Sequence, residues 1–156
     1  MNVEGLSRSE AETLQLAARL ARQLSAGDVV CLEGPLGSGK TCFVRGLATG
    51  LGLDPTAVNS PTFVICQRYQ GTGTALALVH LDAFRLAGPD DLESVGWEEL
   101  LETPDTVIAV EWPSRIAAAL PPRRINVVMT HVDQSTRRIA VDTPPEIAFA
   151  WEGTDA

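Results

Sequence analysis

The sequence is poor in basic residues. Twelve Lys and Arg residues stand against 20 Asp and Glu residues in a chain of 156, which gives a formal net charge of -8. Proteins that grip RNA or DNA over a broad face need clustered Lys and Arg to displace counterions, so the composition argues against that class. One local exception is a set of arginines that we interpret as solvated ends of neighbouring strands: Arg123, Arg124, Arg137 and Arg138.

Long apolar runs and cysteines are scarce as well. No apolar run approaches the roughly 20 residues that a bilayer-crossing helix needs, which predicts a protein with no membrane span. Residues 1–13 contain no basic segment followed by an apolar stretch, so we expect no secretion signal and a cytoplasmic location. The odd set Cys31, Cys42 and Cys66 matches no zinc or disulfide spacing, and we interpret these thiols as reduced and structural.

The length suits one compact α/β domain with a core of its own. We predict a single domain over residues 1–143 and a weakly structured C-terminal tail over residues 144–156. Apolar runs predict six strands, of which the second and third form one hairpin and the last two another. They lie within residues 28–34, 61–70, 75–84, 106–112, 124–132 and 136–143.

Helical periodicity predicts two longer helices. The first lies within residues 7–27, with Ser7 and Glu10 spaced as a capping box. The second follows a glycine-rich loop and ends at Gly50 or Gly52. Short helical pieces are predicted within residues 90–102 and 114–120.

The stretch EGPLGSGKT contains the pattern G-x-x-x-x-G-K-[ST] of a phosphate-binding loop (Walker A). Glycines without a Cβ let the backbone aim several N–H groups at one anion, which then sits on the N-terminus of the following helix. Lys40 is expected to bridge the β and γ phosphates of a nucleotide, and the Thr41 hydroxyl to bind Mg²⁺. The predicted nucleotide-binding residues of the loop are Gly34, Pro35, Leu36, Gly37, Ser38, Gly39, Lys40, Thr41 and Cys42.

Two predicted strands end in an acid, which supplies the carboxylate that magnesium also needs. These acids are Asp82 and Glu111. In an open α/β sheet, ligands bind beyond the carboxyl ends of the strands, so an acid there faces the phosphates if its strand neighbours the loop strand. Periodicity does not say which strand does, and both stay candidates. We interpret His80 as a half-buried strand residue rather than a base.

The segment NSPTF, residues 59–63, lies where a switch segment would sense the γ-phosphate. Ser60 or Thr62 could offer a hydroxyl to magnesium or to the attacking water. An extended loop fixed by Pro61 is the alternative interpretation.

The ordered motifs GPLGSGKT, SPTF, HLDAFR and VEWP resemble those of the TsaE (YjeE) family, the P-loop ATPases of bacterial tRNA threonylcarbamoyladenosine biosynthesis. The resemblance implies a P-loop NTPase-like three-layer fold, with a mixed, mainly parallel sheet and antiparallel hairpins. It also implies ATP hydrolysis with Mg²⁺ and a complex with TsaB and TsaD, which would hold the tRNA while this subunit cycles beside them.

The resemblance further implies roles for particular residues. Lys40 and Thr41 would act as above, Glu111 would be a magnesium ligand, and Asp82 would lie close to the γ-phosphate or its water. Ser60 and Thr62 would form the switch, and residues around Ser9, together with Arg137, would flank the nucleotide. The predicted catalytic set is Lys40, Thr62, Asp82 and Glu111, and the predicted metal ligands are Thr41, Asp82 and Glu111.

The chain departs from the family pattern at two positions. Phe84 stands where the family often has tyrosine, which makes a catalytic phenol there implausible, and Thr136 stands where a glycine often precedes the hairpin arginine. Trp112 follows Glu111 and, if the strand alternates, faces the opposite way, so we favour packing or an interface over base stacking for its role.

Two other classes use the same loop. A kinase acting on a small metabolite or nucleotide usually needs further arginines on a lid, and the stretch that runs from Asp82 past Glu111 to residue 120 holds only Arg85 and Arg115. A GTPase reads guanine with an N-K-x-D motif, which is absent because Lys40 is the only lysine in the chain.

Overall fold

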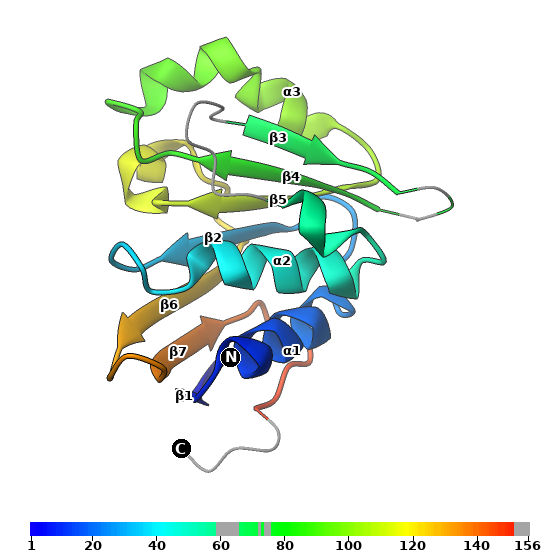
Figure 1. The fold of residues 1–156 in the computed structure, drawn as a ribbon. Coiled ribbons are helices and arrows are strands. Elements are labelled where there is room, and N and C mark those ends of the chain that lie inside the picture. The colour runs from blue at the N-terminus through cyan, green and yellow to red at the C-terminus, as the bar shows by residue number, and fades with distance from the viewer. Residues whose placement is uncertain (59–65, 72, 74–75, 152–156) are drawn as a thin grey trace.

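The computed structural model describes residues 1–58, 66–71, 73 and 76–151, and within them the chain forms a seven-stranded sheet (Figure 1). The strand order is β1-β7-β6-β2-β5-β4-β3. The strands span Asn2–Ser7 (β1), Val29–Glu33 (β2), Cys66–Tyr69 (β3), Ala77–Asp82 (β4), Thr106–Glu111 (β5), Ile125–His131 (β6) and Arg137–Asp142 (β7).

The middle of the sheet is parallel and its edges are antiparallel. β2 pairs in parallel with β5 and β6, and β4 pairs in parallel with β5. β3 pairs antiparallel with β4, and β7 pairs antiparallel with β6 and β1. The prediction of an α/β P-loop fold with a mixed sheet and two antiparallel hairpins is confirmed.

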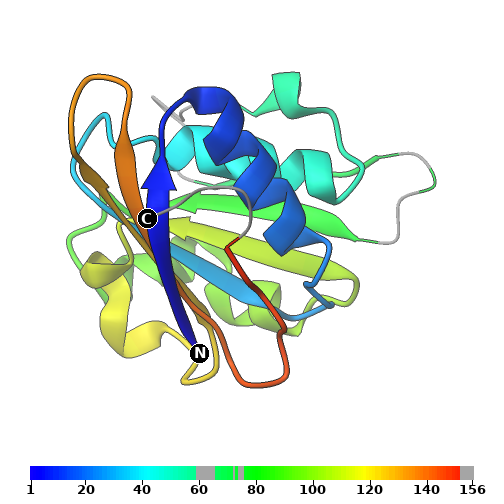
Figure 2. The same ribbon diagram turned by 90° about the horizontal axis from the view of Figure 1, so that it is seen from below.

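Helices cover both faces of the sheet, as Figures 1 and 2 show. The α-helices α1 (Glu10–Ala21) and α2 (Lys40–Gly50) lie on one face, and η2 (Pro89–Val95), α3 (Trp97–Glu102) and η3 (Pro113–Ala119) lie on the other. A short 3₁₀ helix, η1 (Pro55–Ala57), follows α2. None of the helices among the described residues has the length and apolar character needed to cross a membrane.

The two α-helices of the first face pack directly against each other, and glycine permits this. A Cβ at Gly46 would lie 2.5 Å from the Ala17 Cβ and 2.6 Å from the Leu14 carbonyl oxygen. Any larger residue would therefore push α2 away from α1. This contact fixes α2, and with it the loop that precedes α2, against the rest of the layer.

The start of α1 differs from the prediction. Ser9, rather than Ser7, is the N-cap, and its Oγ accepts a hydrogen bond from the Glu12 backbone N–H at 3.1 Å. Ser7 instead ends β1, a strand that the sequence analysis did not predict, and its Oγ lies 2.7 Å from the Thr13 Oγ1. Both serines have a glutamate three residues later, so the capping pattern alone fits either one.

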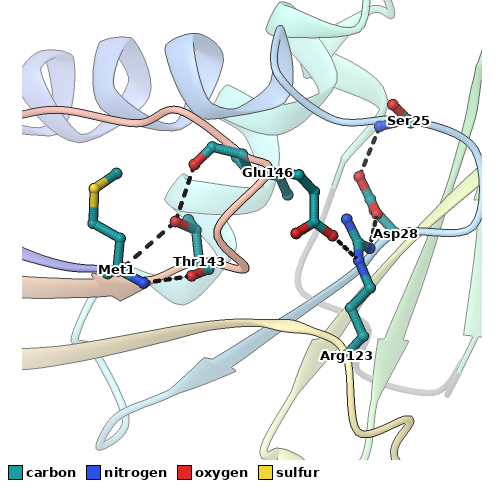
Figure 3. Close-up of polar contacts among 7 residues, drawn as sticks. Met1, Ser25, Asp28, Arg123, Thr143 and Glu146 are labelled. Atoms are coloured by element: carbon teal, nitrogen blue, oxygen red, sulfur yellow. Dashed lines mark hydrogen bonds and ion pairs between the residues drawn. The ribbon is translucent and has the colours of Figure 1, made fainter.

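The predicted tail lacks helix and strand over its described part, residues 144–151, but it is not loose. Ile147 and Phe149 are each only 4% exposed and pack into the core beside α1 and α2. Figure 3 shows how polar contacts hold the same segment: Arg123 pairs with both Asp28 (2.6 Å) and Glu146 (2.5 Å). Arg123 thus connects this segment to the residue that precedes β2. Its side chain is also partly exposed, in line with the interpretation as a solvated strand end.

Candidate functional site

The glycine-rich loop joins β2 to α2, as predicted from the sequence. Its backbone depends on glycine at two points, because Gly37 has φ 77° and Gly39 has φ 102°, values that other residues rarely adopt. Gly39 is the N-cap of α2, and no side chain caps that helix. The N–H groups of its first turn are therefore left for an anion.

The base of the loop packs tightly against β6. A Cβ at Gly34 would lie 2.5 Å from the Met129 carbonyl oxygen and 2.7 Å from the Ser38 Oγ. The Ser38 Oγ is itself buried and has no hydrogen-bond partner in the described part of the chain. A buried hydroxyl without a partner, inside a loop of turned backbone N–H groups, fits a polar ligand such as a phosphate.

Lys40 lies over this loop and is only 5% exposed. Its Nζ donates hydrogen bonds to the carbonyl oxygens of Gly34 (2.5 Å) and Pro35 (3.2 Å), and it lies 3.9 Å from the centre of the Trp112 ring. Burial lowers the pKa of Lys40 from its ordinary value, and three nearby carboxylates oppose that effect. The ammonium is therefore held in place, next to the loop that would receive a phosphate.

The structure distinguishes the positions of the two strand-end acids. β5 neighbours the loop strand β2 directly, whereas β4 lies one strand further away. Glu111, 4% exposed, lies with its Oε2 3.5 Å from the Thr41 Oγ1, at the limit of a hydrogen bond. Asp82 pairs in register with Glu111 across β4 and β5, so both acids lie at the same edge of the sheet.

Asp82 differs from Glu111 in its surroundings. Its Oδ1 accepts a hydrogen bond from the Phe84 backbone N–H at 3.0 Å. Burial raises the pKa of Asp82, and the charge of Glu111 raises it further, while the Phe84 hydrogen bond, His80 and Lys40 oppose the rise. A carboxyl group with a raised pKa is a suitable proton acceptor or donor, which is a different task from binding a metal ion.

His80 is fully buried, so the prediction of a half-buried residue is wrong. It lies on the same face of β4 as Asp82, because side chains two residues apart share a face. Its Nε2 lies 2.5 Å from the Glu111 Oε2. Its place in a strand is confirmed, whereas the interpretation that it is not a base stays a prediction.

Trp112 lies just beyond the end of β5, so the alternation assumed for its direction does not extend to it. Its side chain packs against the apolar cluster between the sheet and η2, α3 and η3, which supports the favoured packing role. The strand ends at Glu111, and Trp112 adopts a left-handed conformation with φ 58°. The turn brings its ring over Lys40 and 5.0 Å from the ring of Phe84, measured between ring centres. The guanidinium of Arg115 lies over the other ring, 5.6 Å from the centre of Phe84.

Glu33 is a residue of this site that the sequence analysis missed. Its carboxylate accepts a hydrogen bond from the Ser114 backbone N–H at 3.2 Å, and the Ser114 hydroxyl lies 3.4 Å from its other oxygen. The contact joins the end of the loop strand to the turn that carries Trp112. Glu33 also ends an apolar strand, so the rule that selected Asp82 and Glu111 would have selected it too.

The outlying predicted residues lie on two sides of the loop. Ser9 caps α1. The backbone carbonyl oxygen of the next residue, Glu10, accepts a hydrogen bond of 3.7 Å from the Cys42 Sγ in the first turn of α2. On the other side, Arg137 donates a hydrogen bond to the Gly37 carbonyl oxygen at 3.3 Å. Whether they flank a nucleotide stays a prediction. Ser60 and Thr62 lie outside the described residues.

The protein oxygens near the loop could hold magnesium only together with a bound phosphate compound. Within the described ranges, no group of three His, Cys, Asp or Glu side chains could hold a metal ion by itself. Thr41 and Glu111 instead offer one hydroxyl and one carboxylate, the small set of protein oxygens that suits an ion bound together with phosphates and water. The arrangement could therefore bind a magnesium nucleotide and polarise its terminal phosphate.

Comparison with known proteins gives one consistent result. The family model described as "Threonylcarbamoyl adenosine biosynthesis protein TsaE" matches residues 7–139. The tRNA threonylcarbamoyladenosine biosynthesis protein TsaE of Treponema pallidum is 37% identical, over 87% of this chain and 97% of its own length. The protein of that name from Bacillus subtilis is 38% identical, over 82% of this chain and 77% of its own length.

A solved structure gives the same comparison in three dimensions. The crystal structure of Bacillus subtilis YdiB superposes with a TM-score of 0.70 and 29% sequence identity. The match covers 94% of this chain and 89% of that chain. The fold described above therefore has a counterpart in a known structure.

Proposed function

Since the chain belongs to the TsaE family of threonylcarbamoyl adenosine biosynthesis proteins, we propose that it is a magnesium-dependent ATPase serving the threonylcarbamoyladenosine modification of tRNA. We propose that it cycles in the cytoplasm on a complex of TsaB and TsaD. Those subunits would hold the tRNA, which suits a chain with a net charge of -8. Hydrolysis by the isolated chain is expected to be slow, because release of the product would limit turnover.

The contact between Glu111 and Thr41 at the start of α2 is the single observation that carries this proposal. It brings a carboxylate and a hydroxyl together beside a loop whose backbone is turned for an anion. Lys40 lies at the same point with its charge directed along the loop. A phosphate loop without such an acid would support nucleotide binding alone, whereas this set supports binding of a magnesium nucleotide.

Each residue takes a separate part in the proposed reaction. The loop N–H groups and Lys40 would bind the phosphates, while Thr41 and Glu111 would hold Mg²⁺. The ion supplies positive charge that stabilises the negative charge on the phosphate oxygens during transfer. Asp82 would orient the attacking water or accept its proton, as the raised pKa of its carboxyl permits.

The test is the release of phosphate from ATP by the purified full chain, measured alone and with TsaB, TsaD and tRNA. We expect slow release by the chain alone and strong stimulation by the three additions together. Lys40→Ala should have no turnover, whereas Arg22→Ala, which removes a positive charge far from the loop, should retain it. No stimulation, with phosphate instead transferred to a small metabolite or nucleotide, would replace this proposal by a kinase.

A further inference from the structure

A buried histidine touches the carboxylate that the proposed function assigns to magnesium. His80 is 0% exposed, and the Glu111 side chain is 5% exposed. The two side chains come from adjacent parallel strands, β4 and β5, and the His80 Nε2 lies 2.5 Å from the Glu111 Oε2. That same oxygen is 3.5 Å from the Thr41 Oγ1, so one carboxylate oxygen lies between the histidine and the loop helix.

We propose that His80 is a positioning residue that fixes the orientation of the Glu111 carboxylate toward Thr41. A glutamate side chain turns freely about its last bonds unless a neighbour engages one of its oxygens. His80 engages Oε2, and in the described part of the chain no hydrogen bond engages Oε1. The inference rests on the proposed function only in naming magnesium as the ion toward which the carboxylate is held.

The geometry also assigns the proton on the imidazole ring. An ionised carboxylate can only accept hydrogen bonds, so the His80 Nε2 must carry a hydrogen that it donates to Glu111. The Nδ1 is buried and has no hydrogen-bond partner among the described residues. The Nε2–H group is therefore the donor of the contact with Glu111.

This arrangement distinguishes positioning from mere packing. An apolar residue of similar size would fill the same space between β4 and α2 but would leave the Glu111 carboxylate free to turn. Partners of this kind, one contact removed from a metal ion, typically change metal affinity by about 10–100-fold when they are removed. A packing role would instead lower stability and affect nucleotide binding equally with and without magnesium.

The first experiment measures the affinity for a fluorescent ATP analogue as a function of Mg²⁺ concentration. His80→Leu should raise the half-saturating Mg²⁺ concentration by about 10-fold or more, while affinity without Mg²⁺ stays within about 2-fold of the unmodified protein. His80→Gln, which keeps an N–H donor, should recover most of the loss. Thr106→Val is the matched control. Thr106 is buried like His80, but it begins β5, at the opposite end of that strand from Glu111.

An equal loss of affinity with and without Mg²⁺ in His80→Leu would contradict the inference. So would a shift in Mg²⁺ dependence no larger than that of Thr106→Val. If the protein binds the magnesium nucleotide but the TsaB–TsaD complex does not stimulate hydrolysis, the proposed function fails and this inference stands.

The second experiment needs no variant, so it remains decisive if His80→Leu does not fold. The chain has only two histidines, His80 and His131, and NMR spectra of ring nitrogens in the ¹⁵N-labelled full chain are correspondingly simple. At neutral pH without nucleotide, we expect the His80 Nε2 to carry a hydrogen. A ring with its hydrogen on Nδ1 alone could not donate to Glu111 and would overturn the proposal.

Discussion

Replacing Trp112 by leucine tests whether its ring stabilises the ammonium of Lys40. The Nζ lies 3.9 Å from the ring centre, and Lys40 is 5% exposed, so the contact is largely desolvated. Contacts of this kind contribute about 1–2 kcal/mol when water is excluded. Trp112→Leu also loses the neighbouring ring of Phe84, 5.0 Å away, so the single variant alone does not isolate the contact.

A double-mutant cycle isolates it. Lys40→Met keeps the aliphatic stem and removes the charge. It also loses the hydrogen bonds to Gly34 and Pro35, but this loss occurs with and without Trp112 and therefore cancels in the coupling energy. The coupling between Lys40→Met and Trp112→Leu in the free energy of unfolding should be about 1 kcal/mol or more. Urea unfolding followed by far-ultraviolet circular dichroism measures it without relying on tryptophan fluorescence.

The matched control pairs Lys40→Met with Phe84→Leu. Phe84 packs against Trp112 but lies under Arg115 rather than Lys40, so its coupling to Lys40 should be clearly smaller than that of Trp112. A coupling to Trp112 no larger than this control would refute the view that the ring and the ammonium interact. Trp112 would then be a packing residue of the η3 side.

Three further predictions concern the carboxylates and the C-terminal segment. Glu111→Ala should weaken the Mg²⁺ dependence of nucleotide binding, whereas Asp82→Ala should slow hydrolysis with less effect on binding. Titration with Mg²⁺ measures the first effect and single-turnover hydrolysis the second. The opposite pattern would exchange the roles of the two acids. Because burial raises the pKa of Asp82, the folded state binds its proton more tightly than the unfolded state does, so ionisation costs stability as pH rises above the ordinary value of 3.8. Asp82→Asn should therefore gain stability relative to the unmodified protein between pH 3.5 and pH 7 in urea unfolding, and a constant difference across that range would contradict the cause given. Arg123→Ala should lower the free energy of unfolding by about 1 kcal/mol or more, because it removes the charged partner of the buried Asp28 carboxylate and leaves it the hydrogen bond from the Ser25 backbone N–H. Arg138→Ala, which breaks only an exposed pair, should cost less.

The elements around the loop could be predicted from sequence because their signals are local. β2 is a short apolar run that ends at a glycine-rich loop, and α2 follows the loop immediately. β1 gives no such signal, since only Val3 and Leu6 of its six residues are large and apolar. It becomes a strand because β7 offers its edge, which is a long-range contact that no local pattern contains.

The residues of the candidate site could largely be predicted from the sequence, but their arrangement around Thr41 could not. Asp82 and Glu111 follow from the rule that strand-end acids face the ligand, yet their distances from Thr41 depend on which strand lies beside β2. Strand order is set by pairing between distant segments, so periodicity leaves it open. The contact of Trp112 with Lys40 was not predicted for a related reason, because alternation holds only while a strand continues, and β5 ends one residue earlier.

The charges around Lys40 explain why an acidic chain would bind an anion more tightly together with a cation. Glu33, Asp82 and Glu111 end three adjacent strands, β2, β4 and β5, and each raises the pKa of the single lysine. The three carboxylates outnumber the one ammonium, so a polyphosphate alone would enter a region of excess negative charge. A divalent ion removes that excess and gives the phosphates a second positive partner. On the proposed function, magnesium and nucleotide therefore strengthen each other's binding, and the orientation of Glu111 by His80 contributes to that coupling.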